Sequence, residues 1–135
     1  MGIPALAFSQ CVLHGNTPHW HTAEHWAPSV ITKALSVAWG ANILINVNFP
    51  DCQPDQVTGI EVTRQGKRKI GDQLVERLDP RNDPYIWIGA QRLEDASEPG
   101  TDIEAAYRGA VAVTPLRVDL TDHPTMTLLS GVFGL

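Results

Sequence analysis

The sequence lacks the features that mark several large classes of protein. Its 135 residues include two cysteines, Cys11 and Cys52, which are too few for a disulfide framework and too unpatterned for a zinc site. No apolar run approaches the roughly 18 residues that span a bilayer, and the start shows neither the basic residues nor the cleavage site of a signal peptide. We therefore expect neither a disulfide-rich secreted domain nor a membrane protein, and the expected compartment is the reducing cytoplasm.

Positive charge is also scarce. Ten Lys and Arg stand against fifteen Asp and Glu, which gives a net charge of -5. This balance offers no broad electrostatic footprint for nucleic acid or for an anionic membrane, so neither is expected as a partner. The single basic run, residues 67–69, is interpreted as the solvated tip of a hairpin.

The common signatures of phosphate binding and nucleophilic catalysis are missing. The chain has no glycine-rich loop between a strand and a helix, no Walker sequence and no Gly-x-Ser-x-Gly elbow. Several histidines lie close together, but their spacing fits no metal-binding motif. We interpret them as part of a solvated loop, with a metal site as the less favoured alternative; they are His14, His19, His21 and His25.

A second polar cluster near the C-terminal end consists of Asp119, Asp122 and His123. Asp and His can act as a general base or as metal ligands. They also precede a helix start that contains a proline, where side chains of this kind cap the helix. Capping or hydrogen bonding between subunits is the preferred interpretation, and a catalytic role is the alternative.

The strongest positive signal is the stretch 42–50, in which apolar residues alternate along one strand face (Ile43, Ile45, Val47 and Phe49). Residues 3–8 form a short continuous apolar run, typical of a strand buried on both faces of a parallel sheet. Between them, apolar residues at helical spacing predict an amphipathic helix over 23–38, capped by Thr22. Strand, helix and strand in this order predict a parallel βαβ unit over residues 1–50.

Ser9 lies at the carboxyl end of the first predicted strand. Ligands of parallel α/β sheets bind at this edge, so Ser9 is the one residue that we place near a candidate site. A serine at a strand end is also common without any function, and that is the alternative.

Residues 57–90 are predicted to form a projecting β-hairpin arm. They combine a half-buried strand, a turn at Gly66 and an aromatic strand that contains Tyr85 and Trp87. Such an arm carries more apolar surface than one hairpin can bury. Tyr85 and Trp87 are therefore expected to contact a partner, preferably another copy of the chain.

Two segments complete the chain. Residues 100–116 are predicted as a short helix, started by the Thr-x-x-Glu capping box of Thr101, and a buried strand that Pro115 ends. Residues 119–135 are predicted as a weakly amphipathic tail that needs a surface on which to dock.

Five blocks of the sequence, in this order and spacing, resemble the C-terminal half of the SurE survival-protein family: GIPALAFS, NILINVNFPD, GIEVTRQGKR, DPRNDPYIWIG and EPGTDIEAAYRGAVAVTPLRVDLT. The resemblance implies an α/β fold, the C-terminal part of a Rossmann-like three-layer domain, with a projecting β-hairpin arm and a C-terminal segment exchanged between subunits of a homo-oligomer. It also implies metal-dependent 5′(3′)-nucleotidase activity. In such an enzyme Mg²⁺ or Mn²⁺ would neutralise phosphate charge and activate water during hydrolysis of nucleoside monophosphates.

The metal ligands of that family are two adjacent Asp, a Ser and an Asn in a glycine-rich loop, and none has a counterpart in this sequence. The resemblance assigns no catalytic and no metal-binding residue here, and it implies that the half carrying those ligands precedes residue 1. What carries over is structural: Asp119 and His123 match positions near the exchanged tail, and residues 85–89 match the arm. We expect the isolated chain to bind no metal and to be inactive. The alternative is a non-catalytic oligomerisation or binding module.

Overall fold

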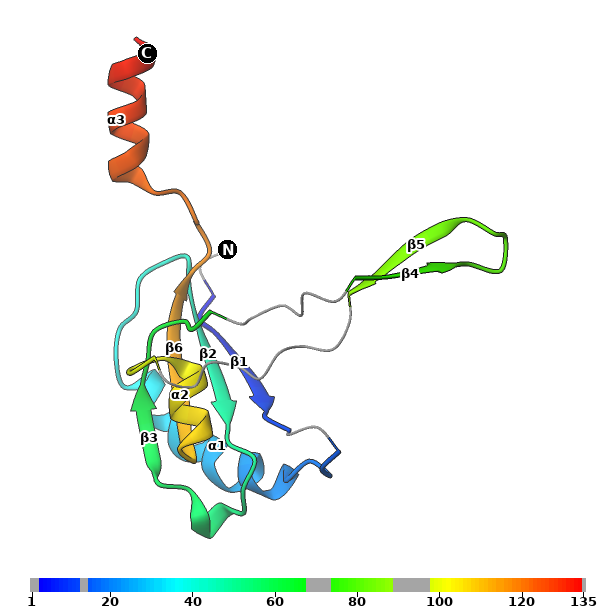
Figure 1. Ribbon diagram of the computed structural model, residues 1–135. Coiled ribbons are helices and arrows are strands. Elements are labelled where there is room, and N and C mark those ends of the chain that lie inside the picture. The colour runs from blue at the N-terminus through cyan, green and yellow to red at the C-terminus, as the bar shows by residue number, and fades with distance from the viewer. Residues whose placement is uncertain (1–2, 13–14, 68–73, 89–97, 135) are drawn as a thin grey trace.

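The computed structural model describes residues 3–12, 15–67, 74–88 and 98–134, and these form a layered α/β body, a separate hairpin and a C-terminal helix (Figure 1). In the body, the strands lie in the order β1, β2, β6, β3. The mixed α/β class predicted from the sequence is confirmed. In chain order the elements are β1 (Ala5–Gln10), α1 (Trp20–Leu35), β2 (Ile43–Phe49), a 3₁₀ turn η1 (Pro54–Gln56), β3 (Gly59–Val62), β4 (Leu74–Leu78), β5 (Pro84–Ile88), α2 (Asp102–Tyr107), β6 (Ala110–Arg117) and α3 (His123–Phe133).

The first part of the chain is a parallel βαβ unit. β1 and β2 pair in parallel, with Ala5 opposite Leu44 and Gln10 opposite Phe49, and α1 connects them. The core lies between α1 and one face of the sheet, where Val30 of α1 packs with buried side chains of β2 and β6. α2 covers the other face through small residues, which are Ala105, Ala110 and Ala112.

β1 is less buried than its apolar sequence predicts. Ile3 is 72% exposed and Phe8 is 42% exposed, whereas a strand covered on both faces was expected. The reason is position: β1 lies at the edge of the sheet, and no described strand pairs with its outer side.

Thr22 does not cap α1 as predicted. The helix begins at Trp20, two residues before Thr22, with His19 at the N-cap position and no side-chain capping bond. Thr22 is fully buried, and its hydroxyl donates instead to the carbonyl of Cys52. The helix also ends at Leu35 rather than at residue 38. The prediction was too long because the apolar spacing in the sequence continues past the last turn of the helix.

Part of the predicted arm belongs to the body. The strand expected to form one side of the arm is β3, which pairs in parallel with β6, because Ile60 packs against the main core. Gly66 is not a hairpin turn either: its N–H donates to the Asp102 carboxylate at the start of α2 (2.7 Å). The basic run falls partly outside the described residues, which include only its exposed first member, Lys67.

The described hairpin consists of β4 and β5, which pair antiparallel. Its turn spans residues 79–83, where the Asp79 carboxylate accepts from the backbone N–H groups of Arg81 and Asp83. Every residue of both strands is exposed. In Figure 1 this hairpin stands away from the body.

Pro115 does not end the last strand, contrary to the prediction. β6 runs to Arg117, and Pro115 lies opposite Ile45 of β2. The Val113 carbonyl accepts from the Thr63 N–H, so the backbone groups of Val113, and of Pro115 two residues later, face the β3 side. β3 pairs with β6 only as far as Val113. At Pro115, therefore, no described strand on this side of β6 needs a backbone N–H donor, and proline is tolerated there.

The caps of the last two helices agree with the sequence in part. The Thr101 hydroxyl accepts from the Glu104 N–H as predicted, but the Glu104 carboxylate bonds Arg108 rather than completing the box. Asp122 caps α3 by accepting from the Thr125 N–H, which confirms the capping interpretation for this residue. No helix in the described ranges is both long and apolar enough to cross a membrane.

Candidate carboxyl-edge site

The most site-like feature is the edge where β1 and β2 both end. Ser9 and Asn48 are direct register partners on these parallel strands, and the Ser9 hydroxyl donates to the Asn48 amide oxygen. Val47 and Phe49 point into the core beside α1, so Asn48 faces the opposite side of the sheet. The Asn48 amide nitrogen carries donors that this bond does not use. A hydroxyl and an amide side by side suit an oxygen-rich anionic ligand.

The segment that follows β2 is joined to two other parts of the chain by three side chains. The Gln10 side chain at the end of β1 donates to the Pro50 carbonyl (2.7 Å). From α1, Thr22 donates to the Cys52 carbonyl, and the Trp26 indole donates to the Pro54 carbonyl (3.1 Å). Residues 50–54 thus form a polar hub between the two strand ends and the start of α1.

Asp51 is the charged member of this hub, and its side chain is only 5% exposed. Its Oδ2 accepts from the Asn16 amide at 2.9 Å, and its Oδ1 lies 3.8 Å from His19 Nε2. The other ring nitrogen of His19, Nδ1, is 3.2 Å from the Gln53 amide nitrogen. An amide nitrogen only donates, so Nδ1 accepts and the neutral ring carries its proton on Nε2, toward Asp51.

His21 and His25 do not join this hub. His21 contacts Glu24 at 3.0 Å on the exposed side of α1, and the His25 ring packs edge-on against Trp26. His14 lies outside the described residues. Within the described ranges, no group of three or more His, Cys, Asp or Glu side chains could hold a metal ion.

The predicted tail residues meet near the start of α3. His123 Nε2 lies 3.6 Å from Asp119 Oδ2, and both side chains are more than half exposed. Hydrogen bonds from the Thr121 hydroxyl and backbone N–H hold the pKa of Asp119 below its usual range. α3 itself buries no residue.

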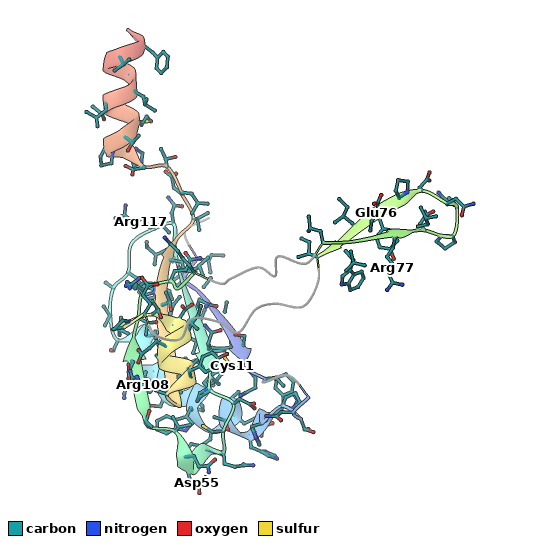
Figure 2. The ribbon with its side chains drawn as sticks, viewed as in Figure 1. Cys11, Asp55, Glu76, Arg77, Arg108 and Arg117 are labelled. Atoms are coloured by element: carbon teal, nitrogen blue, oxygen red, sulfur yellow. The ribbon has the colours of Figure 1, made fainter. Side chains whose placement is uncertain are left out.

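The predicted arm residues Tyr85 and Trp87 share one face of the β4–β5 hairpin. With Val75 and Arg77 they line an open concavity of about 290 Å³. Figure 2 shows Arg77 and Glu76 projecting from the hairpin. Trp87 is 63% exposed, so no part of the chain that the structure describes covers this face.

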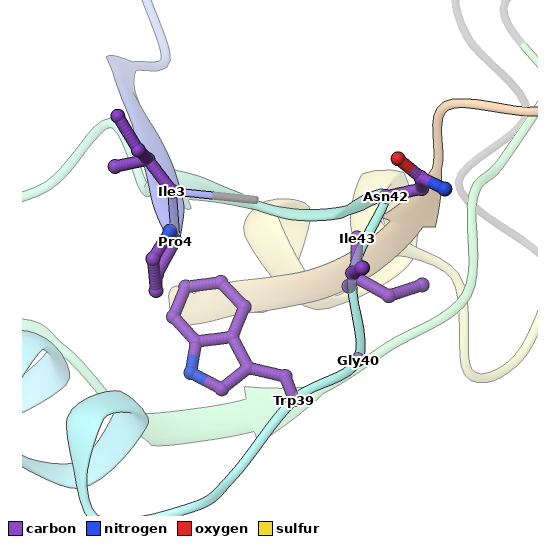
Figure 3. Close-up of a pocket in the computed structure, with 7 residues that line it drawn as sticks. Ile3, Pro4, Trp39, Gly40, Asn42 and Ile43 are labelled. Carbon is purple, nitrogen blue, oxygen red and sulfur yellow. The ribbon is translucent and has the colours of Figure 1, made fainter. Parts of the chain in front are cut away.

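A smaller hollow of about 90 Å³ lies at the opposite, amino-terminal ends of β1 and β2. In Figure 3 the Trp39 ring reaches from the end of the α1–β2 connection toward Ile3 and Pro4. Its lining offers apolar groups and one amide, Asn42, and no titratable side chain. The carboxyl edge is therefore the better candidate for chemistry.

Sequence reasoning placed Ser9 at this edge and assigned no role to Asn48 or Asp51. The available signal was parity: in parallel strands of the predicted βαβ unit, the last outward-facing residues of both strands meet at one edge. No pattern in the sequence predicted that Asp51 would be buried.

The chain is similar to known proteins in both sequence and fold. The family model described as survival protein SurE matches residues 1–72. The chain is 59% identical to the 5′-nucleotidase SurE of Paramagnetospirillum magneticum and 52% identical to that of Rhodospirillum rubrum; each match covers 98% of this chain. The solved structure of the SurE protein from Aquifex aeolicus is 32% identical, with a TM-score of 0.77 over 97% of this chain. The chain spans about half the length of these relatives, and it matches their C-terminal half.

Proposed function

Because this chain belongs to the survival protein SurE family, we propose that it forms the C-terminal part of a metal-dependent 5′(3′)-nucleotidase. The reaction would be hydrolysis of phosphomonoesters, with nucleoside monophosphates as substrates. The proposed compartment is the cytoplasm, since two cysteines without a disulfide pattern fit a reducing environment.

The observation that carries this proposal is 59% identity, over 98% of the chain, to a relative named 5′-nucleotidase SurE. The carboxyl edge supports it in chemical terms. Ser9 and Asn48 bring a hydroxyl and an amide to the sheet edge at which α/β folds bind ligands. In this proposal Ser9 lies near the substrate: its hydroxyl fixes the Asn48 amide by donating to the amide oxygen, and the unused N–H groups of that amide donate to a phosphate oxygen.

The family implies Mg²⁺ or Mn²⁺, but the described residues do not fit such an ion by themselves. Divalent cations of this kind prefer several carboxylate and other oxygen ligands, and no cluster of three acidic, His or Cys side chains occurs in the described ranges. The one buried carboxylate at the edge, Asp51, is engaged with Asn16 and His19. We therefore propose that the metal ligands come from a part of the fold outside these residues.

A chimaera tests the proposed activity. The region of the Paramagnetospirillum magneticum relative that precedes its match to this chain is joined to residues 1–135, and phosphate release from adenosine 5′-monophosphate is measured with Mn²⁺ or Mg²⁺. We expect turnover that a chelator abolishes, and no turnover by the 135-residue chain alone. A folded chimaera without turnover would contradict the proposal.

The role of Ser9 is tested in the same chimaera. Ser9→Ala removes the hydroxyl that fixes the Asn48 amide and should lower kcat/KM at least about tenfold, the loss expected when the hydrogen bond from that amide to a charged phosphate is no longer held in place. Ser36→Ala is the control, because the Ser36 hydroxyl bonds only the carbonyl of Lys33 at the end of α1. Equal activities of the two variants would remove Ser9 from the site.

We also propose that the chain assembles into a homo-oligomer through the hairpin and the tail. The support is exposed apolar surface on both: Ile86, Trp87 and Ile88 on the hairpin, and Val132 and Phe133 on α3. Exposed surfaces of this kind mark interaction sites. The contact between Asp119 and His123 would then hold α3 in the direction of a neighbouring subunit.

Sedimentation of the 135-residue chain tests this assembly. Trp87→Ser and deletion of residues 123–135 should each lower the molar mass of the particle. Val37→Ser is the control, because Val37 is also exposed but lies outside the hairpin and the tail. The second candidate function is a non-catalytic oligomerisation module. It would be favoured if the 135-residue chain forms a defined oligomer and the chimaera is folded but inactive.

A further inference from the structure

We propose that Asp51 is a positioning residue of the carboxyl edge: it fixes the loop of residues 15–19, which leads from β1 to α1, beside the Ser9 and Asn48 pair. That the fixed loop lies beside bound substrate rests on the proposed function. The contact between Asp51 and the loop does not depend on it. The proposal concerns a buried carboxylate to which the site chemistry described above gives no role.

The first support is a difference in exposure: the Asp51 side chain is buried, whereas the side chains of its partners are more accessible to solvent. An aspartate is almost never buried without partners, because removing a carboxylate from water is costly. Asp51 is 5% exposed, and both of its named contacts, Asn16 and His19, come from the 15–19 loop. The loop contributes the groups that make this burial possible, so the contact holds the loop as well as the carboxylate.

The second support is the chain around Asp51, which is held independently of the loop. Gln10 bonds the carbonyl of Pro50, directly before it, and Thr22 bonds the carbonyl of Cys52, directly after it. Asp51 therefore stands on a fixed backbone. A side chain on a fixed backbone can order a flexible partner, since the entropy of its own backbone is already lost.

The third support is the placement of the loop. It lies between β1, which ends at Gln10, and α1, which begins at Trp20, and Figure 1 shows it at the end of the sheet where β1 and β2 terminate. Gly15 has φ 89°, a backbone conformation that glycine adopts readily and other residues rarely do. His19 is the N-cap residue of α1, so one end of the loop is fixed to the helix start.

Gln53 determines which group of His19 faces Asp51. The Gln53 amide donates to Nδ1, so the neutral ring carries its proton on Nε2, and Nε2 lies 3.8 Å from Asp51 Oδ1. The ring therefore presents a donor, and not a lone pair, to the carboxylate.

The experiment uses nuclear magnetic resonance on the 135-residue chain without substrate, so its outcome is independent of phosphate release. In the parent chain we expect backbone order parameters of about 0.8 for residues 15–17 and 19, and a His19 ring protonated on Nε2. Asp51→Ala should lower these order parameters below about 0.6. Asp51→Asn, which keeps an acceptor oxygen for Asn16, should restore most of the order.

Two further variants keep the test decisive. Asn16→Ala removes an exposed partner without touching the hub, and it should loosen the loop even if Asp51→Ala fails to fold. Asp55→Ala is the matched control, because Asp55 is exposed and only four residues further along the same segment. Unchanged order in residues 15–19 of the folded Asp51→Ala or Asn16→Ala chain, or a parent His19 protonated on Nδ1, would overturn the proposal. Failure of the chimaera to release phosphate would overturn the proposed function and leave the contact standing.

Discussion

The hydroxyl of Thr22 in α1 donates a hydrogen bond to the carbonyl of Cys52, thirty residues later in the chain. Thr22 is fully buried, so its hydroxyl cannot turn to water if the bond is lost. This contact joins the first turn of α1 to the segment after β2.

Thr22→Val should therefore destabilise the fold more than its small change in shape suggests. Valine keeps the volume but leaves the Cys52 carbonyl without its donor, at a cost of about 1–3 kcal/mol. Urea denaturation measures the free energy of unfolding. Thr32→Val is the control, because Thr32 is exposed and bonds only Pro28 within the same helix; it should change stability by no more than about 0.5 kcal/mol. Equal effects would show that the Thr22 bond adds nothing.

Gly66→Ala should disturb the junction between β3 and α2. A Cβ at this position would lie 2.9 Å from the Asp102 carboxylate and 2.9 Å from Ile103, closer than packed atoms approach. We expect a loss of about 1–3 kcal/mol from overpacking, read from the thermal midpoint. Gly40→Ala meets nothing within 4 Å and should be neutral. A stable Gly66→Ala chain would mean that the Asp102 and Ile103 side chains can shift away without cost.

Asp119 should titrate at a lower pH than an ordinary aspartate. Hydrogen bonds from the Thr121 hydroxyl and N–H favour its charged form. A lowered folded pKa means that the contribution to stability is present above the ordinary carboxyl pKa and is lost as pH falls through the lowered value. Thr121→Ala should raise the Asp119 pKa in a nuclear magnetic resonance titration, and Thr125→Ala should not. No difference between these variants would assign the shift to another group.

Cys52 should react slowly with an alkylating reagent. Burial, followed by the nearby charges of Asp51 and Asp55, raises the pKa of this thiol, so less of the reactive thiolate is present at a given pH. Peptide mapping after iodoacetamide treatment at pH 8 measures the rate at this one site. Asp55→Asn removes one negative charge and should increase the rate. Glu24→Gln, on the exposed side of α1, should leave it unchanged.

Much of the fold could be predicted from local patterns. The alternation in β2 and the apolar run of β1 identified two strands, and the helical spacing between them fixed their parallel pairing. The same kind of pattern identified β3 as a strand but assigned it to the wrong sheet. Period-two alternation predicts a half-buried strand and contains no information about its neighbour; that choice was made by the packing of Ile60.

The site was less accessible to prediction, because it depends on contacts between distant segments. Ser9 could be placed near the carboxyl edge from strand order alone. Its partner Asn48 is 39 residues away, and the burial of Asp51 depends on a loop whose course no local pattern specifies. Thr22 shows the same limit: a threonine before an apolar helical pattern predicts a cap, but here the tertiary contact with Cys52 outweighs the local one.

Pro115 has a further consequence, for the direction in which the sheet can grow. On the β3 side the ladder stops at Val113, since the next outward-facing residue of β6 has no N–H to offer a strand. β3 itself is only four residues long, and it carries a charged side chain, Glu61, which is paired with Arg108. Short edge strands and charged side chains both discourage pairing with a further strand. β1 has no proline between Ala5 and Gln10, so its outer edge offers a regular row of backbone donors and acceptors. Any additional strand, from whatever chain, should therefore join this sheet from one side only.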